Sequence, residues 1–269
     1  MTQPTMGLVH LNVARLEPLI QFYTETIGLQ VNRTQQNTVH LGVHDRDLLA
    51  LTETPTAKRV SGTAGLYHFA ILLPSRYDLA KSLVHLVRTR TPLQGLSDHG
   101  VSEAIYLEDP ESNGIEIYAD RPSSQWYTGS RLQMVTRALN VDDLTRTLRG
   151  QETTFSTLHP DTYIGHIHLH VGHIQTTEAY YTQQVGLDVV VNYGGSATFM
   201  SYDGYHHHIG ANIWAGRSPR HEGTLGLEKF ELRVHPSRFD DLANRNSIQA
   251  TDSFTLKDPS NNTIVVCRA

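Results

Sequence analysis

Histidines and one carboxylate are the side chains of this sequence whose types and spacing could bind a metal ion. Sixteen histidines occur among 269 residues, several of them at alternating positions of strand-like segments. Residues 109–116 read DPESNGIE and residues 258–265 read DPSNNTIV, so nearly the same phrase is written twice. Only the first copy places a carboxylate, Glu116, in the apolar segment, where the second copy has Val265. Because imidazole and carboxylate are common metal ligands, this difference calls for a chemical explanation.

A further group of histidines lies in the second half of the chain, on alternating positions of two predicted strands: His166, His168, His170, His206 and His208. Alternation places the members of each strand on one face. If the two strands are neighbours, His168 with His206 or His208 could form a second pocket that binds a metal. A hydrogen-bonded polar core is the alternative interpretation, because no carboxylate occupies the matching place in the last part of the chain.

The elements that position these side chains come from an internal duplication. GLVHLNV (7–13) aligns with GHIHLHV (165–171), and FYTETIGLQV (22–31) aligns with YYTQQVGLDV (180–189), both at an offset of 158. GLYHFAILL (65–73) aligns with GLEKFELRV (226–234) at an offset of 161, and the turn phrase recurs at an offset of 149. Matching anchors in the same order indicate two related halves.

Each half divides again into two modules. The first module has an alternating strand, then helical spacing from Leu16 to Ile27 that Gly28 would end, then short strands. The second starts with YHFAILL, continues with a helix from about Tyr77 to Arg90, and ends with strands at EAIYLED and GIEIY. The sequence therefore predicts four βαβββ modules of α+β class.

One module cannot bury both faces of its sheet, so the modules are expected to pair into two domains. Each domain would be a curved, half-open barrel of mixed sheet with its helices outside and a concave face suited to a small molecule. The expected division is an N-terminal domain at 1–121, a connector at 122–162 with some helix at Val141–Leu148, and a C-terminal domain at 163–269.

In this organisation the chain resembles the vicinal oxygen chelate superfamily, which includes glyoxalases, bleomycin resistance proteins and extradiol dioxygenases. The resemblance implies metal ligands on the first strand of each module and on the last strand of the second, which are His10, His68 and Glu116. Two neutral imidazoles and one carboxylate with open positions opposite suit non-haem Fe(II), with Mn(II) as the alternative. The resemblance thus makes the N-terminal domain the metal-bearing one.

The corresponding positions of the second half hold His168, Lys229 and Val265. A lysine ammonium is a poor ligand and valine is none. We therefore expect the C-terminal domain to keep the fold with a degenerate triad.

The segment DHGVSEAIYLEDPESNGIE (98–116) resembles the signature of type I extradiol ring-cleavage dioxygenases. By this resemblance, His99 and Tyr106 would be catalytic residues that touch the bound substrate. Ser97 and Ser112 depart from the pattern, both at loop positions. The histidine-rich phrases of the second half resemble those of two-domain, bacillus-type catechol 2,3-dioxygenases. The family also has a further pocket histidine, for which His40 and His44 are the candidates in this chain.

The predicted function is extradiol cleavage of catechol or a substituted catechol by O2 at Fe(II). One alternative is a glyoxalase-like, metal-dependent isomerase or transferase, for which Glu53 is the candidate fourth ligand. Another is a non-catalytic small-molecule-binding protein of the same fold, a class that tends to lose the triad that this chain retains. The sequence does not identify the catechol.

Composition restricts the partners. The net charge of −5 without a basic patch argues against nucleic acid. No apolar run approaches ~18 residues and no signal peptide is recognised, so a membrane is not expected. The single cysteine, Cys267, fits a reducing cytoplasm. The expected partners are a small aromatic substrate and O2, and homo-oligomer formation is left open.

Overall fold

The computed structural model describes residues 5–129, 131–150 and 154–269. The chain forms two compact units that interleave along the sequence. The first unit contains the chain through Ala14, Thr54–Tyr67 and Ile164–Ala269, and the second contains Arg15–Glu53 and His68–Tyr163. The division expected from the repeats, at 1–121, 122–162 and 163–269, stays a prediction about the duplicated modules.

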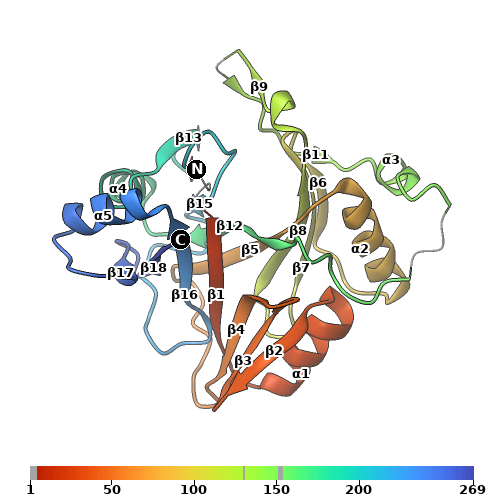
Figure 1. Cartoon of the computed structure of the whole chain (residues 1–269), viewed down its shortest axis with the longest axis horizontal. Helices are drawn as coiled ribbons and strands as arrows, with labels where there is room; N and C mark the ends of the chain where they lie inside the picture. The colour runs from red at the N-terminus through yellow and green to blue at the C-terminus, as the bar shows by residue number, and fades with distance from the viewer. Residues whose placement is uncertain (1–4, 130, 151–153) are drawn as a thin grey trace. The chain divides into compact units, whose positions relative to one another are not determined.

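The first unit contains two groups of hydrogen-bonded strands (Figure 1). One group has the order β17-β18-β16-β1, formed by β17 (Ser253–Lys257), β18 (Thr263–Arg268), β16 (Gly226–Val234) and β1 (Thr5–Val13). The other has the order β12-β15-β14-β13, formed by β12 (Tyr163–His170), β15 (Ile209–Asn212), β14 (Ala197–Ser201) and β13 (Asp188–Tyr193). The helical elements of this unit are α4 (Ile174–Tyr180), the π-helical turn η3 (Tyr181–Val185) and α5 (Pro236–Arg245).

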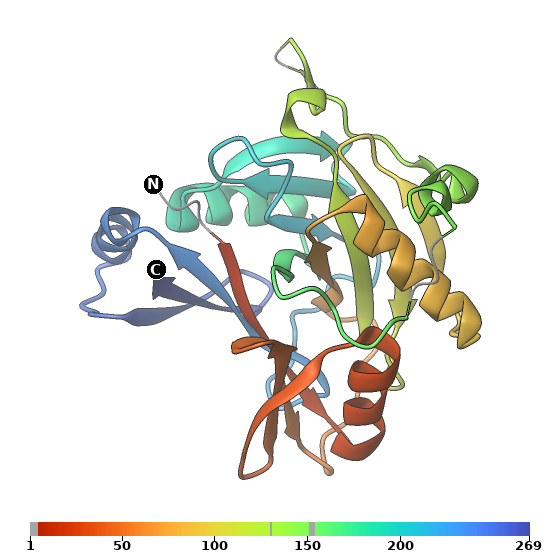
Figure 2. The ribbon, with the colours of Figure 1, turned by 45° about the vertical axis from the view of Figure 1, so that its right-hand side comes forward.

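The second unit has the same kinds of parts. Three strands lie in the order β4-β3-β2, formed by β4 (Arg46–Glu53), β3 (Thr38–Val43) and β2 (Gln30–Gln35). A longer group has the order β11-β6-β7-β8-β5, formed by β11 (Arg137–Ala138), β6 (Gly95–Asp98), β7 (Ser102–Glu108), β8 (Gly114–Asp120) and most of β5 (Gly65–Leu73). Figure 2 shows α2 (Arg76–Arg88) lying along one face of this longer group.

The remaining elements of the second unit are short: α1 (Leu16–Gln21), the π-helical turn η1 (Phe22–Ile27), the 3-10 turn η2 (Ser123–Gln125), β9 (Tyr127–Thr128), β10 (Arg131–Leu132) and α3 (Val141–Arg146). The helix predicted over Leu16–Ile27 is present as α1 and η1. Gly28 ends it with a φ of 91°, and Gly186 ends the repeated helix with a φ of 78°. A positive φ costs glycine little, so both copies stop at the same residue type.

Three modules share one strand pattern in which the first strand pairs in parallel with the last. These pairs are β5 with β8, β12 with β15, and β16 with β18, while the other strands add in antiparallel fashion. A parallel pair needs a long crossover connection, which α2, α4 and α5 provide. The predicted α+β class with βαβββ modules is confirmed.

Candidate metal centre

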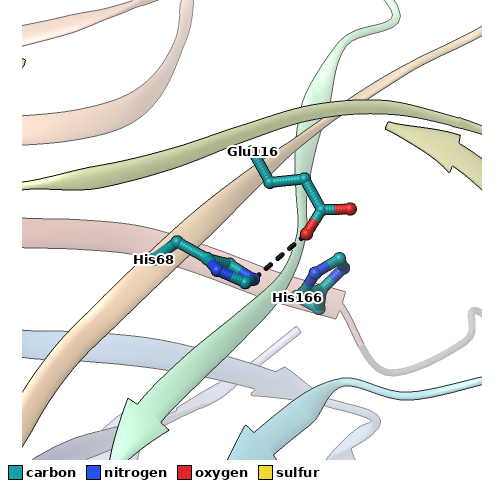
Figure 3. A group of neighbouring side chains, drawn as sticks. All are labelled: His68, Glu116 and His166. Carbon is teal, nitrogen blue, oxygen red and sulfur yellow. Dashed lines mark ion pairs between the residues drawn. The ribbon is translucent and has the colours of Figure 1, made fainter. Parts of the chain in front are cut away.

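His68 and Glu116 lie next to each other because β5 and β8 run side by side. Ala70 pairs with Glu116 in this parallel register, and His68 is two residues before Ala70, so its side chain lies on the same face. Nε2 of His68 is 3.0 Å from Oε2 of Glu116, as the dashed line in Figure 3 shows. Both side chains are buried, with exposed fractions of 7% and 3%. A buried carboxylate is costly without a cation or a donor, so this pair of groups is suited to a metal ion.

Tyr106 and His99 adjoin this pair in the same unit. Tyr106 on β7 stands directly opposite Glu116 on β8, and its ring centroid is 5.5 Å from that of His68. Nε2 of His99 is 2.8 Å from the hydroxyl oxygen of Tyr106. The ring of Tyr106 packs on a buried cluster of side chains from β5, β7 and β8, which fixes its position. The structure thus brings together His68, Glu116, Tyr106 and, through Tyr106, His99.

His68 and Glu116 are the two ligands of the predicted triad that lie in the same compact unit. His10, the third ligand expected from the sequence, belongs to the other unit. It lies half-buried on β1, opposite Lys229 on β16, and its role as a ligand stays a prediction.

The two candidates for a further pocket histidine have different surroundings. His40 is buried, and its Nδ1 lies 3.1 Å from Oδ2 of Asp47 and 3.2 Å from a guanidinium nitrogen of Arg33. His44 is exposed in a turn, where it has a φ of 54°. The identity of the pocket histidine stays open. Glu53, the candidate fourth ligand of a glyoxalase-like site, accepts a hydrogen bond of 3.0 Å from the backbone N–H of Leu16.

The histidines of the predicted second pocket have hydrogen-bond partners within the first unit. Nε2 of His168 is 3.0 Å from Nδ2 of Asn212, and Nδ1 of His208 is 2.9 Å from the hydroxyl of Ser201. Nδ1 of His206 is 2.9 Å from Nδ1 of His207. These contacts are those of a buried polar network. A metal-binding role for His168, His206 and His208 stays a prediction.

Comparison with known proteins places this chain in a family. Residues 5–117 match the family described as the glyoxalase/bleomycin resistance protein/dioxygenase superfamily. The chain is 42% identical to catechol-2,3-dioxygenase of Bacillus subtilis (strain 168), over 94% of this chain and 93% of that protein. It is 26% identical over 125 residues to biphenyl-2,3-diol 1,2-dioxygenase 3 of Rhodococcus globerulus, which covers 44% of this chain and 64% of that protein.

The chain therefore belongs to the glyoxalase/bleomycin resistance protein/dioxygenase superfamily, and its named relatives are extradiol-type oxidoreductases. The predicted resemblance to the bacillus-type catechol 2,3-dioxygenases is confirmed. Solved structures support the fold alone. A candidate dioxygenase of Bacillus subtilis superposes with a TM-score of 0.66 at 12% identity, over 98% of this chain and 84% of that one. Glyoxalase I of Zea mays superposes with a TM-score of 0.55 at 13% identity, over 98% and 92%.

The helices in the described residues are all too short or too polar to span a membrane.

Proposed function

We propose that this protein is an extradiol ring-cleaving dioxygenase that opens catechol or a substituted catechol with O2 at a non-haem iron(II). The observation that carries the proposal is the buried pair of His68 and Glu116, 3.0 Å apart and beside Tyr106. It occurs in a chain that is 42% identical to a catechol-2,3-dioxygenase. The family alone would not decide between chemistries, whereas this combination of ligands and neighbours favours one.

The residues present fit iron. His68 offers a ring nitrogen and Glu116 a carboxylate oxygen, and the combination of imidazole and carboxylate ligands with open positions is the one that non-haem iron(II) oxygenases use. Bound at this place, the metal would take up both hydroxyl oxygens of a catechol and provide a site for O2. Manganese(II) accepts the same donors and is the alternative metal.

We propose His10 as the third ligand, because GLVH (7–10) and GLYH (65–68) place His10 and His68 at the same position of their modules. The metal content of His10→Ala tests this assignment, with His166→Ala, at a buried histidine of β12, as the comparison. His10→Ala should lose most of its iron and His166→Ala should keep it. The reverse result would make His166 the ligand.

Tyr106 and His99 would supply the polar contacts around the reacting ring. Nε2 of His99 and the Tyr106 hydroxyl are 2.8 Å apart, so one hydrogen bond joins them. A catechol hydroxyl that replaced the Tyr106 hydroxyl at Nε2 would find an acceptor for its proton, and the Tyr106 hydroxyl released from His99 would then be a donor to the catechol oxygen. Such groups typically contribute about 10²–10⁴-fold to a rate.

The test is oxygen uptake and absorbance of a ring-opened product with the full chain, purified anaerobically and loaded with iron(II). Catechol, methylcatechols and 2,3-dihydroxybiphenyl serve as substrates. We expect one O2 consumed for each ring opened, together with a yellow product. A glyoxalase-like isomerase would consume no O2, and a binding protein would shift ligand absorbance without turnover. Either outcome with iron-loaded protein would overturn the proposal.

The cellular setting is part of the same proposal. Iron(II) and one unpaired cysteine, Cys267, are compatible with a reducing cytoplasm. The partners would be a small aromatic substrate and O2, with neither nucleic acid nor membrane involved. Size-exclusion chromatography with light scattering would establish whether the chain forms a homo-oligomer.

A further inference from the structure

The segment that follows the second module does more than link two parts of the chain. Its strand β11 pairs with the edge strand β6, immediately before the loop that carries His99. Beside this pairing, Val135 and His99 exchange two hydrogen bonds. The backbone N–H of Val135 donates to the carbonyl oxygen of His99 over 3.0 Å, and Nδ1 of the His99 ring lies 2.9 Å from the carbonyl oxygen of Val135.

The second of these bonds determines which ring nitrogen of His99 carries the proton. A carbonyl oxygen can only accept, so Nδ1 must donate to Val135. In the neutral imidazole Nε2 then has the lone pair, and it accepts from the Tyr106 hydroxyl, 2.8 Å away. With Nδ1 committed to Val135, Nε2 is the ring atom that faces the candidate site as an acceptor.

The loop that carries His99 is held from its other side as well. Oδ1 of Asp98 accepts from the backbone N–H of Gly100 over 2.8 Å, and Oδ2 accepts from the Arg121 guanidinium over 3.0 Å. Arg121 also donates to Glu103 over 3.0 Å, and Glu103 is only 2% exposed. A buried carboxylate anchors this chain of ion pairs, so the backbone at residues 98–100 has a defined place.

Gly100 makes the close approach of the connecting segment feasible. Its φ is 75°, and a Cβ at this position would lie 2.3 Å from the carbonyl oxygen of Gln133. A positive φ favours glycine on steric grounds. The approach to the backbone of Gln133 excludes a larger residue independently. Any side chain at residue 100 would push the segment Gln133–Val135 away from His99.

We propose that the segment Gln133–Val135 is a positioning part of the catalytic site, which holds His99 in its Nδ1-protonated tautomer so that Nε2 accepts a proton from Tyr106 or from a substrate hydroxyl. The consequence for turnover rests on the proposed function, whereas the tautomer of His99 does not. Val135 acts through its backbone carbonyl, so its side chain is free to vary. This explains how a segment without a catalytic side chain of its own can control the reaction.

Two glycine variants test the proposal. Gly100→Ala introduces the clash with Gln133, while Gly129→Ala is the matched control in the same connecting segment. Gly129 also has a positive φ, 62°, but no atom of the other described residues lies within 4 Å of a Cβ at that position. Both variants therefore carry a similar backbone penalty, and only the first displaces Gln133–Val135.

For Gly100→Ala we expect kcat to fall roughly 10²-fold, the effect of misplacing a catalytic group by about 1 Å, with iron content and KM nearly unchanged. Gly129→Ala should retain the kcat of the unaltered chain. Equal kcat values in both variants, or a loss of iron from Gly100→Ala, would overturn the positioning role.

The tautomer is measured separately by two-bond ¹H–¹⁵N correlation spectra of the full chain with ¹⁵N-labelled histidine, after removal of metal. The His99 signals are assigned by their loss in His99→Gln. The Nδ1–H pattern is expected in the unaltered chain and in Gly129→Ala, and an Nε2–H pattern in the unaltered chain would refute the inference, even if Gly100→Ala fails to fold. If His99 shows the Nδ1–H pattern but the chain cleaves no catechol, the proposed function is wrong. The tautomer is then confirmed, and its effect on turnover is refuted.

Discussion

The two copies of the turn phrase have nearly the same internal contacts. In the first copy, Oδ1 of Asp109 accepts from the backbone N–H groups of Glu111 and Asn113, both over 2.9 Å. Its Oδ2 accepts from the side-chain amide of Asn113 and from the hydroxyl of Tyr23, both over 2.8 Å. One carboxylate thus ties the turn to itself and to the helix of the first module.

In the second copy, Oδ1 of Asp258 accepts from the backbone N–H groups of Ser260 and Asn262 over 2.8 Å. Its Oδ2 accepts from the Asn262 amide over 3.0 Å and from the Tyr181 hydroxyl over 3.2 Å. Burial raises the pKa of Asp258, as it raises the pKa of Asp109. Burial likewise raises the pKa of Tyr23 and of Tyr181.

The copies differ in the strand that follows. Glu116 is buried against His68, whereas Val265 pairs with Glu231 on β16 and Thr255 on β17, with Lys229 at the place that His68 has in the first half. The comparison separates the role of the aspartate turn from the role of the residue in the strand that follows it. The aspartate turn is structural and occurs twice, whereas the buried carboxylate that we propose as a metal ligand occurs once.

We expect the largest effect on turnover when Glu116 of the first copy is replaced by valine, the residue at the matching position of the second copy. Glu116→Val should reduce turnover of catechol to background, because one of the proposed metal ligands is removed and the buried His68 loses its anionic partner. Val265→Ala is the matched control in the other copy and should retain turnover. Steady-state oxygen uptake measures both variants. Substantial activity in Glu116→Val would show that the first copy does not supply a metal ligand needed for turnover.

Tyr106→Phe should keep its metal but slow turnover by about 10²–10⁴-fold, since we propose that the hydroxyl positions a substrate oxygen and does not bind the metal. Iron content and kcat are measured on the same preparation. Tyr127→Phe, at an exposed tyrosine, is the control. Full activity of Tyr106→Phe on every catechol tested would remove this hydroxyl from the mechanism.

Tyr23→Phe and Tyr181→Phe should each lower the free energy of unfolding by about 1–3 kcal/mol, because each removes a buried hydrogen bond to a carboxylate. Neither should alter iron content. Urea unfolding monitored by circular dichroism gives the two values. Similar losses would confirm that both turns are architectural, and loss of iron from Tyr23→Phe alone would show that the first turn is coupled to the metal.

His168→Ala should have the smallest effect on function. The loss of its hydrogen bond with Asn212, inside a buried network, is expected to cost about 1–3 kcal/mol of stability, with no change in iron content or in rate per iron. Thermal unfolding and metal analysis are the measurements. A rate per iron that falls with His168→Ala would place chemistry in the second half.

The strands and helices could be predicted because they depend on local patterns. Alternation marked β1, helical spacing followed by Gly28 marked α1 and η1, and the turn phrase marked the entry to β8. The family resemblance predicted that Tyr106, His68 and Glu116 would share a site, and the structure explains their proximity by the parallel pairing of β5 with β8.

Other features depend on contacts between distant segments, which periodicity does not encode. The approach of Val135 to His99 joins residues 36 apart in the sequence, through a stretch that reads only as a connector. The interleaved course of the two compact units also follows from tertiary packing rather than from the repeat.

The central claim is that only the copy with Glu116 contributes a metal ligand. Its most direct test is the number of iron(II) ions bound per chain. Anaerobic titration and elemental analysis measure this number for the full chain and for two variants. We predict one iron per chain in the unaltered protein, one in Lys229→Ala, and none in Glu116→Val. Two irons per chain, or iron that leaves with Lys229→Ala and remains in Glu116→Val, would contradict the assignment of chemistry to the Glu116 copy.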